Sequence, residues 1–178
     1  MQNTAIIGQN FSETEEANAT KTAYYPLNSD KISGFLAVEY TAEKLVRLSF
    51  RAEPCTAQGE RSGFSDLVRA QVCEYLAGER KAFSIPCILT GTAFQKSVFR
   101  AILSVPYGRT VSYGDVAKQL GKPKAVRAVG GALHRNPLLF LVPCHRVVGR
   151  DGKLTGFAGG VALKEYLLRL ERENADAE

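Results

Sequence analysis

The alternation of apolar and polar residues in the first half of the chain predicts strands followed by a helix. Two β-prone runs, residues 35–40 and 45–50, are separated by four residues, as in a hairpin. Apolar residues then recur at helical spacing over residues 64–77, and Gly78 ends that pattern. Residues 1–30 are polar and rich in Asn, Thr and Glu, so we expect a loose arm there. The residues expected to face inward from the helix are Leu67, Val68, Val72, Tyr75 and Leu76.

The pattern becomes helical in the second half of the chain. Thr92 is suited to cap a helix that ends before Pro106. A second helix is expected to start after Ser112 and run to Leu120, and a third is expected over about 124–133, with Gly121 in the turn between them. Two short helices joined in this way predict a helix-turn-helix.

These patterns divide the chain into two domains. We expect an N-terminal α/β domain over residues 1–86 and a mainly helical domain over residues 87–178, so the fold class is α/β in the α+β sense. The segment 84–91, interrupted by Pro86, is the expected connection. A chain of 178 residues with 45% hydrophobic content is long enough to bury a core in each part.

Charge is distributed unevenly between the two halves. Residues 1–89 carry nine Lys or Arg against eleven Asp or Glu, a net of −2, whereas residues 90–178 carry fourteen against seven, a net of +7. The second half is therefore the candidate surface for a polyanion, although a modest basic excess often serves only solubility.

The sequence shows neither the pattern of a signal peptide nor a cysteine spacing typical of disulfides. Residues 1–16 have no basic start and no long apolar run, so we expect a cytoplasmic protein, associated with the nucleoid if the cell is bacterial. The four cysteines are 18, 14 and 57 residues apart, a spacing that favours free thiols. No metal site is expected, because the cysteines are far apart in the sequence. A site built from scattered ligands, including His134 or His145, is left open.

Cys144 and His145 form the candidate chemical centre. A Cys–His pair can activate the thiol as a nucleophile, but neighbouring side chains of a regular strand point to opposite faces. Either a third group mediates between them or the backbone turns. Lowering a thiol pKa by one unit requires about 1.4 kcal/mol of preferential stabilisation of the thiolate.

The segment around this pair resembles one known family. Residues 136–148 read NPLLFLVPCHRVV, and together with GTAFQ at 91–95, PYG at 106–108, VSY at 111–113, AVRAVG at 125–130 and GG at 159–160 they resemble the O6-alkylguanine-DNA alkyltransferases. The resemblance covers residues 91 to about 170, and Pro143-Cys144-His145-Arg146-Val147 is its most specific part. The first half fits the family's N-terminal domain by length and position only. The resemblance implies a ribonuclease-H-like N-terminal domain and a helix-turn-helix that binds DNA.

The activity that the resemblance implies is DNA repair without a cofactor. The protein would flip O6-alkylguanine out of duplex DNA and transfer the alkyl group irreversibly to Cys144, with O4-alkylthymine left open as a substrate. His145 would act on Cys144 through a bridging water and would itself be oriented by Glu165. Tyr113 would promote base rotation and donate to the leaving guanine. Glu165 could instead form an exposed i,i+4 pair with Arg169, and Tyr113 could be a core aromatic.

The resemblance also implies how DNA is held. The third helix would lie in the minor groove, and Arg127 would fill the gap left by the flipped base. Asn136 would brace the junction between the helix-turn-helix and the active site, although Asn before Pro is also a common turn former. The small residues that would let this helix approach DNA, or that would serve only tight helix packing, are Ala125, Ala128 and Gly130.

The base pocket is expected to use side chains and backbone groups after the third helix. The Ala158 N–H would donate to the guanine, and the carbonyls of Cys144 and Val147 would accept from its amino group. The chain has Phe99 where tryptophan is frequent, Phe157 where tyrosine is frequent and Ala158 where some members have serine, so the breadth of the pocket is open. The expected pocket residues are Leu133, Val147, Leu154, Phe157 and Ala158.

The expected partner is double-stranded DNA that carries O6-alkylguanine, with no membrane partner. We expect a monomer, and clustering on DNA stays open. Three other classes are less consistent with the sequence. A lesion-binding protein of the same family would lack Cys144, a dimeric transcription regulator would need a dimerisation element, and a cofactor-dependent methyltransferase would need a glycine-rich nucleotide loop.

Overall fold

The computed structural model describes residues 11–12, 19–28, 32–53, 55–154 and 156–175. The chain forms two compact units, the first made of residues 1–90 with 137–141 and the second of residues 91–136 with 142–178. The first unit contains β1 (Phe11–Ser12), β2 (Lys21–Asn28), β3 (Ser33–Tyr40), β4 (Leu45–Arg51), α1 (Gly63–Leu76) and β5 (Cys87–Ile88). The second contains α2 (Ala93–Leu103), β6 (Val111–Ser112), α3 (Tyr113–Gln119), α4 (Val126–His134), the 3₁₀ turn η2 (Cys144–Arg146), β7 (Val147–Val148) and α5 (Val161–Asn174).

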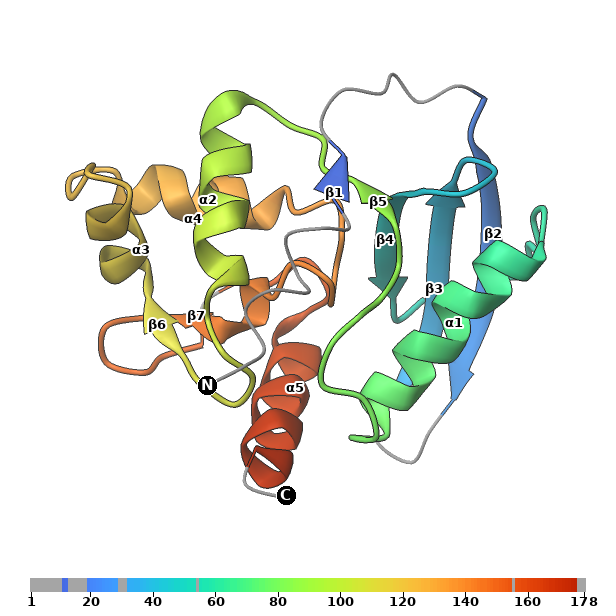
Figure 1. Cartoon of the computed structure of the whole chain (residues 1–178). Helices are drawn as coiled ribbons and strands as arrows, with labels where there is room; N and C mark the ends of the chain where they lie inside the picture. Colours follow the sequence, from blue (N-terminus) through green and yellow to red (C-terminus); the bar gives the residue numbers. More distant parts are fainter. Residues whose placement is uncertain (1–10, 13–18, 29–31, 54, 155, 176–178) are drawn as a thin grey trace. The chain divides into compact units, whose positions relative to one another are not determined.

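The first unit is a mixed sheet with α1 on one face (Figure 1). The strand order is β1-β5-β4-β3-β2, in which β2, β3 and β4 are antiparallel and β5 runs parallel to its neighbours. The predicted hairpin and the predicted helix are both confirmed. Val68, Val72 and Tyr75 are buried as expected, but Leu67 is 46% exposed, so the inward stripe is narrower than predicted.

Residues 21–28 correct the expectation of a loose arm over residues 1–30. They form β2, the outermost strand, in which Ala23, Tyr25 and Leu27 are buried at alternate positions. Pro26 argues against a strand when only the sequence is read. An edge strand tolerates proline, because a backbone N–H on the outer side of the strand makes no hydrogen bond within the sheet. Residues 1–10 and 13–18 of the expected arm lie outside the described residues.

The predicted domain boundary at residues 86 and 87 is also corrected. Cys87–Ile88 is a strand of the first unit, so the boundary falls after Thr90. The first unit in addition includes residues 137–141, because the N–H of Leu48 donates to Pro137 O (2.8 Å) and the N–H of Leu139 donates to Leu48 O (3.0 Å). The chain therefore leaves the second unit just before the Cys144 motif and returns at Val142.

The second unit is helical, with one short parallel strand pair. Thr92 caps α2 through a reciprocal capping box with Gln95, which confirms the predicted start, and Ser112 caps α3 in the same way with Asp115. α2, α3 and α4 pack on one another, and α5 packs on η2. Pairing of β6 with β7 places the residue before Tyr113 beside the strand that follows Cys144, at Ser112↔Val148. The α3 start and the turn that carries Cys144 are thus held together by backbone hydrogen bonds.

Candidate active site

Cys144 and His145 lie on a single 3₁₀ turn, so the backbone turns at this pair. The N–H of Arg146 donates to Pro143 O (3.0 Å), and the turn ends where β7 begins at Val147. In a 3₁₀ helix successive side chains are about 120° apart, so Cys144 and His145 point into different parts of the second unit. The turn is one of the two arrangements that the sequence left open.

The Cys144 thiol is buried and hydrogen-bonded. It is 4% exposed, and Asn136 Nδ2 donates both to Cys144 Sγ (3.1 Å) and to Val142 O (2.8 Å). Burial raises the pKa of Cys144 to about 11, while the Asn136 hydrogen bond and the charge of Lys164 act in the opposite direction. The resting residue is therefore a neutral thiol that needs a base to become a nucleophile.

Asn136 occupies the position at which the chain leaves the second unit. Its side chain bonds to the backbone of Val142, the residue at which the chain returns, and so closes the excursion of residues 137–141. The same amide contacts Cys144 Sγ. One side chain thus fixes both the return point of the chain and the sulfur.

His145 is fully buried, and its Nε2 faces the Glu171 Oε1 at 2.9 Å. Burial lowers the pKa of His145 in spite of the opposing effect of Glu171, so the imidazole is neutral. A neutral imidazole beside a carboxylate donates from the nitrogen that faces it, which makes Nδ1 the basic nitrogen. The ring of Phe157 lies edge-on to His145, with centroids 6.4 Å apart and planes at 86°.

Glu171 is the centre of a buried ionic network. It accepts hydrogen bonds from Arg146 Nε (2.9 Å to Oε2) and Arg146 Nη2 (2.8 Å to Oε1), and from the N–H of Gly108 (3.0 Å to Oε2). Burial by itself raises the pKa of Glu171, but the hydrogen bond from His145 and those from the charged Arg146 outweigh burial and hold the pKa well below its usual range. The carboxylate is therefore ionised and fixed on both oxygens.

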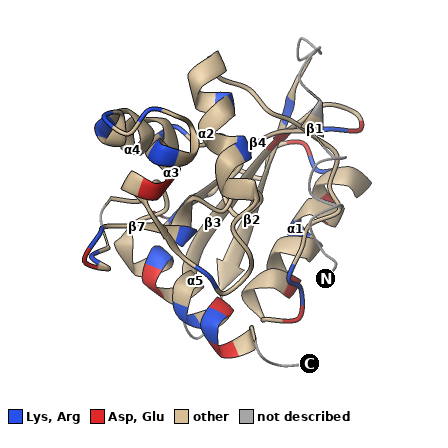
Figure 2. Ribbon diagram, turned by 60° about the vertical axis from the view of Figure 1, so that its left-hand side comes forward, with Lys and Arg blue, Asp and Glu red and all other residues tan. Residues whose placement is uncertain are grey.

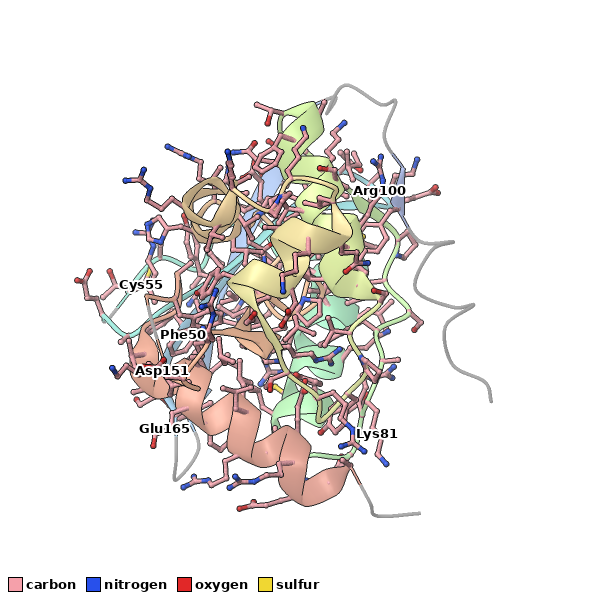
Figure 3. All side chains as sticks on the ribbon, turned by 90° about the vertical axis from the view of Figure 1, so that its left-hand side faces the viewer. Phe50, Cys55, Lys81, Arg100, Asp151 and Glu165 are labelled. Atoms are coloured by element: carbon pink, nitrogen blue, oxygen red, sulfur yellow. The ribbon has the colours of Figure 1, made fainter. Side chains whose placement is uncertain are left out.

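Glu165 was expected to orient His145, and this prediction is wrong. Glu165, labelled on α5 in Figure 3, is exposed, and the carboxylate beside His145 belongs to Glu171. The alternative pairing of Glu165 with Arg169 is not found either, because Arg169 lies 4.0 Å from Glu173. Positions 165 and 171 are six residues apart, so they point to different sides of a helix with about 3.6 residues per turn.

The sequence does contain a signal for Glu171. The buried face of α5 is Leu163, Lys164, Leu167, Leu170 and Glu171. Lys164 and Glu171 are seven residues apart and lie on the apolar stripe, where a charged residue is expected only if it has a partner. The functional carboxylate is therefore identified by its position on the buried apolar face of α5, and not by its distance in sequence from Cys144 and His145.

Lys164 is a second site residue that the sequence did not single out. Its side chain is 1% exposed, and its Nζ donates to Val147 O at 2.6 Å and lies 5.8 Å from the centroid of the Tyr113 ring. Burial lowers the pKa of Lys164, and the nearby Cys144 acts in the opposite direction. A buried ammonium therefore lies within electrostatic range of the sulfur.

The expected DNA-contacting residues are grouped on α3 and α4. Tyr113 is the first residue of α3 and half-buried, and a Cβ added to Gly130 of α4 would lie 3.8 Å from its ring. Arg127 and Ala128 are exposed on α4, and Ala125 is the half-buried N-cap. Figure 2 shows Lys and Arg on these helices and on α2. The exposed basic residues of α2, α3, α4 and the segments next to them are Arg100, Arg109, Lys118, Lys122, Lys124, Arg127 and Arg135.

The expected pocket residues have different environments. Leu133 and Phe157 are buried, Leu154 is half-buried and Ala158 is exposed. The Val147 carbonyl already accepts from Lys164, and Phe157 packs on His145. Contact of the five expected pocket residues with a base stays a prediction. Phe157 also contacts the His145 ring, which the sequence did not indicate.

Three further properties concern the whole of the described chain. Within the described ranges, no group of three or more His, Cys, Asp or Glu residues is placed to hold a metal ion. Among the helices that the structure describes, none has both the length and the apolar character needed to cross a membrane. All four cysteines are free.

Comparison with known proteins gives the same family over the region that holds this site. The family described as 6-O-methylguanine DNA methyltransferase, DNA binding domain, matches residues 93–173. The methylated-DNA–protein-cysteine methyltransferase of Methanosarcina acetivorans is 54% identical over 101 residues, a match that spans 57% of this chain and 65% of that relative's length.

Solved structures extend the likeness to most of the chain. The O6-methylguanine methyltransferase of Mycobacterium tuberculosis is 38% identical with a TM-score of 0.76, over 88% of this chain and 96% of that one. The M. tuberculosis protein solved in complex with DNA is 39% identical with a TM-score of 0.75, over 85% and 94% of the two chains. A likeness of this identity and coverage shows that the chain belongs to the O6-methylguanine-DNA methyltransferase family.

Proposed function

We propose that this protein repairs DNA by moving an alkyl group from O6 of a damaged guanine onto Cys144. The observation that carries the proposal is the buried Cys144 thiol, which accepts a hydrogen bond from Asn136 and lies on the same turn as His145, whose Nε2 faces Glu171. The relatives' name describes a transfer from methylated DNA to a protein cysteine, and the chain has a nucleophile suited to that reaction.

The proton of the thiol goes to His145. Because Nε2 faces Glu171, the nitrogen that receives the proton is Nδ1, through a bridging water of the kind that the family resemblance implies. The imidazolium that forms is then stabilised by the ionised carboxylate, as in other Cys–His–carboxylate systems. Asn136 Nδ2 and the Lys164 ammonium stabilise the thiolate that results.

The thiolate attacks the alkyl carbon and displaces guanine. The S–C bond forms as the C–O6 bond breaks, and the electron pair of the C–O6 bond stays on the guanine. Donors near the leaving base stabilise that charge, and the Tyr113 hydroxyl and the Ala158 N–H are the proposed ones. The product is a thioether, which has no good leaving group, so each molecule reacts once.

DNA is the partner of the second unit, and α3 with α4 form its helix-turn-helix. The basic residues on these helices supply contacts to phosphates, and Arg127, exposed near the start of α4, enters the space that the flipped base leaves. The first unit has the ribonuclease-H-like arrangement of the family, which the antiparallel strands β2, β3 and β4 with α1 support.

An intact-mass experiment tests the proposal. The protein is mixed with excess duplex DNA that contains O6-methylguanine, and we expect a gain of one methyl group per molecule, located on the peptide that contains Cys144. Cys144→Ser is expected to bind DNA without any gain in mass, because a serine hydroxyl is a much weaker nucleophile at neutral pH. A methyl group on Cys55, Cys73 or Cys87, or repair of several lesions per molecule, would contradict the mechanism.

A further inference from the structure

The loop between α2 and β6 contacts the ionic network of the active site at three points. Arg146 Nη1 donates to Val105 O at 2.6 Å, and the Arg146 guanidinium lies over the Tyr107 ring at 5.7 Å. The N–H of Gly108 donates to Glu171 Oε2 at 3.0 Å. One loop therefore contacts both members of the buried Arg146–Glu171 pair.

The Gly108 N–H adds a backbone donor to the side-chain donors around Glu171. Oε1 faces His145 Nε2 at 2.9 Å and Arg146 Nη2 at 2.8 Å, while Oε2 accepts from Arg146 Nε at 2.9 Å and from Gly108. The Arg146 fork holds the carboxylate along one edge only. The Gly108 N–H approaches from another element and opposes rotation of the carboxylate about its own bond.

We propose that the backbone N–H of Gly108 is a positioning group that fixes Glu171 and thereby the tautomer of His145. The inference rests on the proposed function, because the tautomer matters only if His145 accepts the proton of Cys144. A carboxylate held in this orientation keeps the histidine proton on Nε2 and leaves Nδ1 basic. A carboxylate free to rotate would allow both tautomers.

The backbone at residue 108 requires glycine for two reasons. Its φ of +73° is in the left-handed region, and a Cβ at this position would lie 2.5 Å from Ala175 Cβ and 3.1 Å from Glu171 O. Any side chain at residue 108 would therefore push on the turn of α5 that carries Glu171. Gly152 has a similar φ of +75°, but a Cβ there would have nothing within 4 Å, so this glycine separates backbone strain from the contact with α5.

The test compares Gly108→Ala with the matched control Gly152→Ala. The chain has two histidines, so ¹⁵N-histidine labelling gives a simple spectrum in which His134→Gln assigns the His145 signals. We expect the unaltered protein and Gly152→Ala to show His145 protonated on Nε2, and Gly108→Ala to show a mixture of tautomers. The rate of alkyl transfer should fall by about tenfold or more in Gly108→Ala and by less than about twofold in the control.

Two further measurements keep the inference testable if Gly108→Ala folds poorly. Gly108→Ala combined with Ala175→Gly removes the 2.5 Å contact and should recover most of the tautomer signal and the rate. In the unaltered protein, the Gly108 amide proton should exchange slowly with solvent and should lose that protection in Glu171→Gln. A fast-exchanging Gly108 amide, or a Gly108→Ala spectrum and rate equal to those of Gly152→Ala, would overturn the inference.

The outcomes also separate this inference from the proposed function. If the unaltered protein gains no alkyl group, the proposed function fails, whatever the tautomer. If it gains the alkyl group while Gly108→Ala keeps its tautomer and rate, only the role of Gly108 fails.

Discussion

Replacement of Glu171 by Gln removes one charge from the buried network and keeps the shape of the side chain. The donors that reach the carboxylate include His145 Nε2, two nitrogens of Arg146, and the N–H of Gly108. The amide of a glutamine has only one acceptor oxygen, so at least one of these donors loses its partner in Glu171→Gln. The Arg146 guanidinium, whose side chain is 7% exposed, also loses its counter-charge.

The size of the effect follows from these contacts. Breaking one side of a buried ion pair costs about 3–5 kcal/mol of folding free energy, because the other charge stays buried. In a chain of this length, that loss lowers the melting temperature by about 10 °C or more. Loss of an oriented base lowers the rate of alkyl transfer by about 10²-fold.

Glu165→Gln is the matched control, because it makes the same change on the same helix at an exposed position. We expect its melting temperature and its transfer rate to equal those of the unaltered protein. The assay is single-turnover transfer from radiolabelled O6-methylguanine DNA, run beside thermal unfolding. Equal rates for the two variants, or a slower reaction in Glu165→Gln, would refute the assignment of Glu171 as the carboxylate of the relay.

Three other predictions follow from the same contacts. Stability should fall with acidification, first below the ordinary histidine pKa of about 6.5, because folded His145 resists protonation, and again below the ordinary glutamate pKa of about 4.5, because folded Glu171 stays ionised. Urea unfolding between about pH 8 and 2.5 measures both losses, and a flat profile would contradict the prediction. Lys164→Met should slow alkyl transfer by about tenfold or more without lowering the free energy of unfolding, because the substitution removes a buried charge, and Lys153→Met at an exposed position should change neither the rate nor the stability. A loss of stability that matches the loss of rate would argue that Lys164 has a purely structural role. Arg127→Ala should slow repair of duplex DNA more than reaction with free O6-alkylguanine, and an equal effect on both substrates would exclude the role of this residue in base flipping.

The helices and strands that the sequence predicted share strong local signals. Thr92 with Gln95 and Ser112 with Asp115 are capping boxes, and a local hydrogen bond of this kind depends little on the rest of the fold. The strand over residues 21–28 was missed because Pro26 and the polar residues around it obscure the alternation of Ala23, Tyr25 and Leu27. What identifies that segment as a strand is its pairing with β3, a contact that depends on residues further along the chain.

The active site shows the same division between local and distant information. Cys144 and His145 were predicted because the motif is contiguous, but the carboxylate that faces His145 lies 26 residues further along the chain. Gly108 is separated from Glu171 by 63 residues and contacts it through a backbone N–H, which no side-chain pattern reveals. Lys164 was missed because a lysine on a helix is usually solvated. Only the phase of the α5 stripe marks it as buried.

The resting state of Cys144 also limits how the thiol can react. With a pKa raised to about 11, forming the thiolate at pH 7 costs about 5 kcal/mol, and about one molecule in 10⁴ is ionised at any moment. A population this small protects the sulfur from oxidants and from adventitious electrophiles, since the thiolate is the reactive form. The proton therefore has to be passed to a base before the sulfur can attack the alkyl carbon. The neutral His145 can accept that proton, and the ionised Glu171 stabilises the imidazolium that forms.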